Sequence, residues 1–266
     1  MKRRSFLSAG VALGMTPVMA RSVLAESFTQ AAAGVQYYEW IRYRLLPGNR
    51  QSLVADYYRD AAIPALNKAG IKTVGVFNIK HGPDAPTLHV IVPHPTMDSV
   101  VTLNDRLLDD KSFVQAGNRF LNAPMSDPAF FTMEKSILKA FTGLPEIQIP
   151  AQKKANQPRI FQVRTYESTS LVASKKKIQM FNEGGEIAIF KRTGLQPVLF
   201  GETVAGTKMP SLVYILAFAD LNDLDRNWNV FRNDPEWGKL KDDPYYADIH
   251  SFTNDWIWTP APFSQI

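Results

Sequence analysis

Arginine and tyrosine side chains alternate near the start of the second half of the chain, in the segment "QVRTYE". Every second residue of an extended strand points to the same face, so Gln162, Arg164 and Tyr166 share one face. An arginine can hold a carboxylate through two hydrogen bonds, and a tyrosine can donate a further one. Glu39 and Tyr43 stand at the corresponding places of the first half, in "YYEWIRYR". These five residues form the candidate ligand-binding set.

The same residues also allow a purely structural interpretation. Arg164 could pair with Glu39 as an ion pair that locks the two halves together, because a buried arginine requires a counter-charge. The sequence favours this ion pair and leaves ligand binding as the alternative.

Other residue types give no second candidate site. The chain contains no cysteine, which excludes disulfides, thiolate nucleophiles and cysteine metal sites. Two of the four histidines, His89 and His94, are five residues apart around a strand, so we expect them on opposite faces and not converging with Asp84 or Asp98 on a metal. We also expect His81 and His250 to be structural, although an axial haem ligand at His250 is the alternative. The predictions are therefore no metal and no cofactor.

Two further clusters have both a structural and a functional interpretation. The segment "SKKK" at 174–177 is interpreted as the solvated face of a helix, with binding of acidic groups as the alternative. Four tryptophans crowd the second half, and we expect them to fill the core, although an aromatic-ligand or carbohydrate surface is conceivable. They are Trp228, Trp237, Trp256 and Trp258.

The elements around these residues occur twice, at an offset of 123 or 124 positions. Tyr43 corresponds to Tyr166 at the first offset, and Gly70 corresponds to Gly194 at the second. Each half contains a strand, a helix that ends at its glycine, two strands joined by a turn, a second helix and a last strand. Register held over several elements in order indicates a tandem repeat. The expected organisation is a first repeat at 36–142, a linker at 143–158 and a second repeat at 159–266.

This order of elements predicts an α+β fold with two tandem ferredoxin-like repeats. A ferredoxin-like sheet is covered by helices on one face only, so we expect the two sheets to pack against each other as an intrachain pseudo-dimer. Five residues are expected under the helices, namely Tyr38, Trp40, Phe161, Val163 and Thr165. The five candidate ligand-binding residues are then expected between the sheets, where polar groups need partners.

Several segments resemble the NIPSNAP family. The match includes "QVRTYE" and, in the first half, "EWIRYRLLPGN", with the passages "IPALNKAGIKTVGVF" and "IAIFKRTGLQPVLF" and the closing "DWIWTPAPFS". The resemblance covers residues 36–266 as two copies, and Ile41 replaces the arginine of the first copy. It implies the dimeric α/β-barrel (ferredoxin-like) fold. The wider group of proteins with this fold includes monooxygenases, haem enzymes and small-molecule binders, so the resemblance implies no single activity.

The first 25 residues are expected to be an export signal. Lys2, Arg3 and Arg4 precede an apolar run too short to cross a bilayer, and the arginine pair favours the twin-arginine route to a periplasmic or extracellular location. Cleavage after Ala20 and cleavage after Ala25 both stay open. Losing these three residues and Arg21 removes four of the 30 basic residues and brings their number close to the 25 acidic ones. Net charge therefore gives no reason to expect nucleic-acid binding.

The sequence favours an exported, non-catalytic protein that binds a small molecule or a protein partner through the inter-sheet space or the helical exterior. The alternative is a cofactor-independent monooxygenase or isomerase that uses the same space. No membrane span is expected in the mature chain, and assembly beyond the pseudo-dimer stays open.

Overall fold

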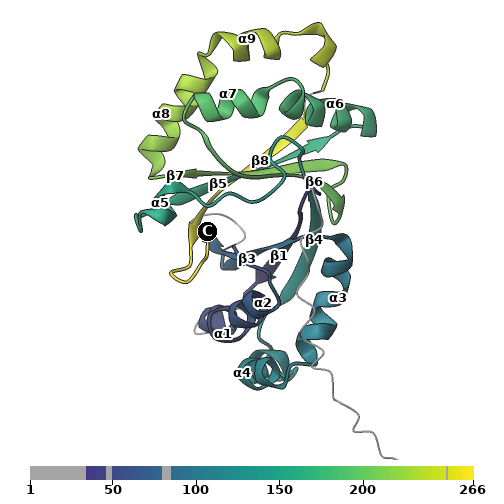
Figure 1. Ribbon diagram of the computed structural model, residues 1–266, viewed down its shortest axis with the longest axis vertical. Coiled ribbons are helices and arrows are strands. Elements are labelled where there is room, and N and C mark those ends of the chain that lie inside the picture. The colour runs from purple at the N-terminus through teal and green to yellow at the C-terminus, as the bar shows by residue number, and fades with distance from the viewer. Residues whose placement is uncertain (1–33, 46–49, 80–84, 250) are drawn as a thin grey trace, which may run out of the picture.

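A single closed antiparallel barrel organises the molecule (Figure 1). The computed structural model describes residues 34–45, 50–79, 85–249 and 251–266. The predicted export signal, His81, Asp84 and His250 lie outside the described residues. The strand order around the barrel is β1-β3-β2-β8-β5-β7-β6-β4.

The first half supplies four neighbouring strands of this barrel, and its helices cover their outer face. Its elements are β1 (Tyr37–Arg44), α1 (Arg50–Tyr57), the π-helical turn η2 (Tyr58–Ala62), α2 (Ile63–Lys68), β2 (Gly75–Ile79), β3 (Thr87–His94), α3 (Met97–Leu108), α4 (Lys111–Leu121) and β4 (Thr132–Ala140).

The second half repeats this order after a short connecting helix, α5 (Ala151–Lys154). Its elements are β5 (Ile160–Ser168), α6 (Leu171–Asn182), α7 (Glu186–Arg192), β6 (Gln196–Ala205), β7 (Ser211–Phe218), α8 (Leu221–Arg232), α9 (Pro235–Lys241), the 3-10 turn η3 (Pro244–Tyr246) and β8 (Ser251–Pro260). Figure 1 shows the helices of the two halves on opposite sides of the barrel. The predicted α+β fold of two packed ferredoxin-like repeats is confirmed.

Strand register confirms the repeat at the level of single residues. Tyr43 of β1 lies opposite Leu88 of β3, and Tyr166 of β5 lies opposite Leu212 of β7. These pairs reproduce the offsets of 123 and 124. The two halves are joined edge to edge by the pairs β2–β8 and β4–β6, so both sheets lose their free edges.

Glycine and proline divide the helices where the sequence predicts. Gly70 and Gly194 follow the helices at φ +87, a left-handed conformation that costs glycine little. Gly185 also has φ +87 and separates α6 from α7. In the first half the chain passes through η2 just before Pro64, which stands at the start of α2.

The barrel interior is apolar and is shared by both halves. Its core contains Tyr38, Phe77 and Leu138 of the first half with Phe161 and Trp258 of the second, and all five side chains are fully buried. Phe77 packs edge to face against Phe161 with ring centres 4.9 Å apart. An eight-stranded barrel is only wide enough for side chains to fill it, so large apolar residues occupy this space.

The sequence-based assignment of the two faces was therefore wrong. The residues expected under the helices, such as Tyr38, Phe161 and Val163, belong to the barrel interior. The candidate ligand-binding set, Glu39, Tyr43, Gln162, Arg164 and Tyr166, lies on the outer faces under the helices. Tyr43 belongs to the helix-covered core of the first half, and Tyr166 packs against that of the second. The alternation was correct, but the enclosed face takes the apolar side chains because buried polar groups need partners.

Helices complete one further core on each side. In the first half, Tyr58, Leu66, Leu103 and Phe113 pack on the sheet, and in the second half Phe181 and Phe190 do so with their neighbours. Within the described segments, no helix combines the length and apolar character that spanning a membrane requires.

Because the interior core draws on both halves, neither half should fold alone. A fragment of residues 34–150 would expose the apolar inner face of its sheet and the unpaired edges of β2 and β4. We expect it to aggregate or to pair with itself and to lack a cooperative thermal transition, measured by circular dichroism and size-exclusion chromatography. A monomeric fragment with a cooperative melt would contradict the shared core.

Acid should weaken the barrel through His89. Its Nδ1 accepts a hydrogen bond from Trp40 Nε1 at 3.0 Å, and its ring stacks on Trp258 at 4.2 Å. Burial, aided by the charge of Arg42, lowers the pKa of His89 from 6.5 to about 3. The unfolded chain therefore binds the proton more tightly, and stability falls as the pH drops from about 6.5 towards 3, by up to ~1.4 kcal/mol per pH unit.

His89→Gln keeps a hydrogen-bond acceptor but cannot be protonated in this range. We expect thermal melts of this variant to lose less stability between pH 7 and pH 4 than those of the wild type. An unchanged pH slope would show that His89 is not the responsible group.

Candidate functional site

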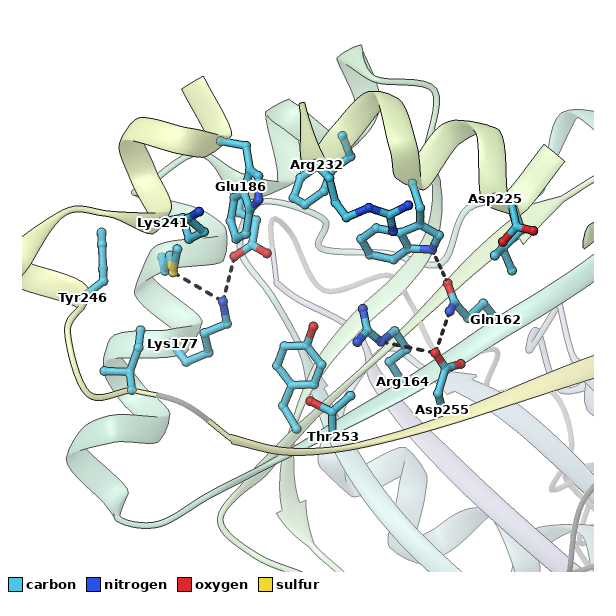
Figure 2. A pocket seen from close by; sticks show the side chains of 17 residues that line it. Gln162, Arg164, Lys177, Glu186, Asp225, Arg232, Lys241, Tyr246, Thr253 and Asp255 are labelled. Atoms are coloured by element: carbon cyan, nitrogen blue, oxygen red, sulfur yellow. Dashed lines mark hydrogen bonds and ion pairs between the residues drawn. The ribbon is translucent and has the colours of Figure 1, made fainter. Parts of the chain in front are cut away.

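A cavity of about 550 Å³ lies in the second half, between the outer face of the barrel and the helices (Figure 2). Strands β5 and β8 form its floor, α6, α8 and α9 form its walls, and the first residue of α7 also reaches it. This cavity brings together three of the five candidate residues, Gln162, Arg164 and Tyr166. They meet here because they alternate along β5 and face the helices.

The Arg164 guanidinium is held by aromatic rings. Its carbon lies 5.1 Å from the ring centre of Trp228 and 5.3 Å from that of Tyr166. Nη1 donates a hydrogen bond to Tyr214 Oη at 3.1 Å. Nε is buried and makes no hydrogen bond to the described residues, and Asp255 Oδ2 is 3.6 Å away. Arg164 is therefore fixed in position with part of its hydrogen-bonding capacity unused.

Asp255 is bound more closely to Gln162 than to Arg164. Gln162 Nε2 donates to Asp255 Oδ2 at 2.7 Å, and Trp228 Nε1 donates to Gln162 Oε1 at 2.6 Å (Figure 2). Burial raises the pKa of Asp255, although Arg164 and Gln162 act in the opposite direction. The Asp255 oxygen nearest Arg164 is thus held by Gln162 and does not form a close hydrogen bond to the guanidinium.

A buried ion pair lies elsewhere in the cavity wall. Lys177 Nζ of α6 donates to Glu186 Oε2 of α7 at 3.1 Å, and the two residues are 9% and 3% exposed. Burial raises the pKa of Glu186 against the opposing influence of Lys177 and Arg164. The interpretation of "SKKK" as a solvated face was thus wrong at two of its four positions. Ser174 and Lys177 are buried because α6 turns them towards the sheet, whereas Lys175 is exposed.

Aromatic side chains give the cavity its apolar surface. Trp228, Phe231 and Trp237 line it, and the rings of Phe231 and Trp237 lie 4.6 Å apart. The expectation that the tryptophans fill the core is confirmed for Trp258, which is fully buried in the barrel. Trp228 does both, because it belongs to the helix-covered core and also faces the cavity.

The cavity carries more positive than negative charge. Four cationic residues line it, Arg164, Lys177, Arg232 and Lys241, against three anionic ones, Glu186, Asp225 and Asp255. With the aromatic walls, this composition suits an organic molecule that has a flat apolar body and an acidic group.

The remaining two candidates lie far from this cavity, under the helices of the first half. Glu39 Oε1 accepts a hydrogen bond from Lys135 at 2.6 Å, and His94 Nε2 lies 3.6 Å from its other oxygen. Burial opposes ionisation of Glu39, but the contacts with His94 and Lys135 outweigh it and lower its pKa. The predicted ion pair between Arg164 and Glu39 was therefore wrong, because the barrel separates their two outer faces.

Tyr43 also has a structural environment. Its hydroxyl lies 2.9 Å from that of Tyr58, and its ring packs against Phe120 and Phe130. The equivalent region of the first half is thus filled by aromatic side chains where the second half has a cavity.

The described histidines lie as their spacing predicts. His89 faces the barrel interior, whereas His94 faces the helices and contacts Ser99 Oγ at 2.8 Å. Among the described residues there is no cluster of three or more histidine, aspartate and glutamate side chains that could hold a metal.

A cleft of about 80 Å³ opens at one end of the barrel, beside Trp40 and Trp256.

The fold and its cavity define a tandem protein of the dimeric α/β-barrel type. Similar solved structures include a candidate monooxygenase from Lactobacillus acidophilus NCFM, with a TM-score of 0.55 and 8% identity over 85% of this chain and 94% of that one. A second candidate monooxygenase, from Fusobacterium nucleatum, has a TM-score of 0.56 and 8% identity over 85% and 93%. At this identity the likeness shows the fold alone.

The NIPSNAP family model matches residues 38–142 and again residues 161–265. The chain therefore belongs to the NIPSNAP family and contains two tandem copies. A NIPSNAP family protein of unknown function from Agrobacterium tumefaciens is 24% identical over 41% of this chain and 93% of its own length, with a TM-score of 0.36. No curated protein matches the chain.

Sequence reasoning missed Glu186 and Asp255 as cavity residues, and it considered Lys177 only as part of "SKKK", with binding of acidic groups as the alternative. A signal existed for Asp255, because β8 pairs with β5 and sets this residue directly opposite Arg164. Lys177 and Glu186 lie on two helices separated by Gly184 and Gly185, and only the bend at these glycines brings their side chains together.

The buried Glu186 should make stability depend on pH. Since the folded protein raises its pKa above the ordinary value of 4.5, the folded state binds the proton more tightly than the unfolded chain. Stability from this group is therefore present at low pH and falls as the pH rises above about 4.5, at up to ~1.4 kcal/mol per pH unit. We expect Glu186→Gln to flatten this part of the profile, measured by thermal melts.

Glu183→Gln is the matched control, because Glu183 is exposed and lies three residues earlier. If both variants kept the wild-type slope, burial of Glu186 would not affect its proton affinity.

Proposed function

We propose that this NIPSNAP-family protein binds a small organic anion with a flat apolar body in the helix-covered cavity of its second half. The observation that supports this function is Arg164, which is fixed between Trp228 and Tyr166 and whose side chain stays 22% exposed and donates one hydrogen bond, to Tyr214, among the described residues. An acidic group of the ligand would bind Arg164, and its apolar part would lie against Trp228 and Trp237. The cavity volume suits a molecule of this kind.

The proposal moves the binding site from the inter-sheet space to the outer face. Large side chains fill the barrel interior, so a ligand of this size would not fit there.

We also propose that binding takes place after export, because the amino-terminal arginine pair favours the twin-arginine route. Native mass spectrometry of protein purified from its own host compartment would identify a retained acid.

Two fluorescent probes test the role of Arg164. The anion 1-anilinonaphthalene-8-sulfonate and the uncharged N-phenyl-1-naphthylamine share one aromatic body and differ in the sulfonate. We expect Arg164→Met to weaken binding of the anion by about tenfold or more, because a charge-assisted hydrogen bond contributes about 1.5–3 kcal/mol. Binding of the uncharged probe should change by less than about twofold. Fluorescence titration measures both.

Arg226→Met is the control, because Arg226 lies on α8, one of the cavity walls, but is exposed and pairs with Asp223 outside the cavity. It should leave both affinities unchanged. Equal affinity of wild type and Arg164→Met for the anion would refute the proposed function, as would an equal loss for both probes.

A further inference from the structure

Arg164, Tyr214 and Tyr166 form a hydrogen-bonded chain that ends at a hydroxyl group beside the cavity. Tyr214 Oη accepts a hydrogen bond from Arg164 Nη1 at 3.1 Å and lies 3.0 Å from Tyr166 Oη. Tyr214 is fully buried, so its own proton requires an acceptor, and Tyr166 Oη is the one beside it. If Tyr166 accepts this proton, its own O–H is free to donate to a ligand. Tyr166 lines the cavity, so its hydroxyl group is in a position to donate to a ligand bound there.

The order of this chain strengthens the donor at its end. The guanidinium can only donate, which fixes the direction of the first hydrogen bond, and the need of the buried Tyr214 proton for an acceptor directs the second towards Tyr166. Each hydrogen bond polarises the next, so the Tyr166 hydroxyl is a stronger hydrogen-bond donor than that of an isolated phenol. Burial also raises the pKa of Tyr166, so the hydroxyl keeps its proton and remains a donor. Such a fixed donor stabilises negative charge that develops on a ligand oxygen.

A carboxylate stands in the wall of the same cavity. Glu186 opens α7, and Lys177 binds its Oε2 (Figure 2). The Lys177 ammonium lies 4.9 Å from the ring centre of Phe181 and 5.9 Å from that of Trp237, which holds the pair in place. The charged and titratable groups that act on Glu186 are Lys177 of α6, Arg164 and Tyr166 of β5 and Tyr214 of β7. Lys241 of α9 lines the same cavity.

An anion anchor, a fixed hydroxyl donor and a buried base in one cavity are the groups that enolisation of a carbonyl compound requires. We propose that the cavity catalyses proton transfer at the carbon next to the carbonyl group of an aromatic 2-oxo acid. This inference rests on the proposed function, because it uses the same anion anchor at Arg164 and the same aromatic walls.

The reaction balances without a cofactor or an oxidant. Glu186 takes a proton from the carbon, the electrons of that C–H bond form a carbon–carbon double bond, and the carbonyl electrons move to the oxygen. Tyr166 donates a hydrogen bond to this enolate oxygen, while Arg164 holds the carboxylate. Return of the proton from Glu186 to carbon restores the keto acid. In D2O the proton on Glu186 first exchanges with the solvent, so the carbon receives deuterium in its place. The burial that strengthens Glu186 as a base therefore serves the chemistry.

Phenylpyruvate is the probe, because it joins a carboxylate, a carbonyl group and an activated CH2 to a phenyl ring. Proton NMR in D2O at low buffer concentration measures exchange of the CH2 protons, and saturation-transfer NMR measures binding. We expect the wild type to exceed protein-free exchange by about a hundredfold or more. Glu186→Gln and Tyr166→Phe should each lose about a hundredfold in rate while they keep binding. Arg226→Met should behave like the wild type.

Two further measurements keep the result interpretable. Circular dichroism melts show whether each variant is folded. If Glu186→Gln does not fold, Tyr166→Phe and the wild-type pH profile still test the proposed proton transfer. The wild-type rate should rise with pH through a pKa above the ordinary range of glutamate, as Glu186 loses its proton. A profile that is flat, or one that Glu186→Gln leaves unchanged, would show that another group is the base.

The failures of the two proposals are distinguishable. Binding of phenylpyruvate through Arg164 without exchange above the protein-free rate would overturn proton transfer and leave anion binding intact. Binding of the naphthalene sulfonate but not of phenylpyruvate would overturn the assigned substrate class. Undiminished exchange in both Glu186→Gln and Tyr166→Phe would overturn the assigned roles. Loss of Arg164 dependence for every anion would overturn both proposals.

Discussion

Edge-to-edge pairing of the two halves is the constraint on which the rest of this structure depends. The pairs β2–β8 and β4–β6 close eight strands into a barrel, so the backbone of both sheets is hydrogen-bonded on both sides. Closure encloses one face of every strand completely. Large apolar side chains, among them Tyr38, Phe161 and Trp258, fill most of that face. The larger cavity lies on the outer face, where helices cover the strands without sealing every space.

The sequence predicted the architecture because the two halves share the spacing of their strands and of the glycines that end their helices, although few residues are identical. Tyr43 and Tyr166, or Gly70 and Gly194, keep their spacing even where little else is identical. The orientation of the faces was harder to predict, because both faces of β5 contain large side chains. The alternation separates the face of Phe161 from that of Arg164, but only barrel closure decides which of the two is enclosed.

The site was predictable to the extent that it lies on one strand. Arg164 and Tyr166 stood out because a cation on a half-buried strand needs an explanation. The rest of the site depends on contacts between elements that are distant in sequence. Glu186 meets Lys177 only across the bend at Gly185, and Trp228 reaches Gln162 only when α8 packs on the sheet. No periodicity within one element contains that information.

Comparison of the two halves shows how the second comes to hold the larger cavity. Where the first half sets Ile41 opposite Lys135, the second sets Arg164 opposite Asp255. In the first half the strand cation pairs directly with Glu39, and aromatic side chains fill the space beneath the helices. In the second half the cation lies on β5, and its guanidinium faces the cavity. The first half thus supplies a packed scaffold that closes the barrel, so the second can hold a cavity lined by polar groups without loss of the shared core.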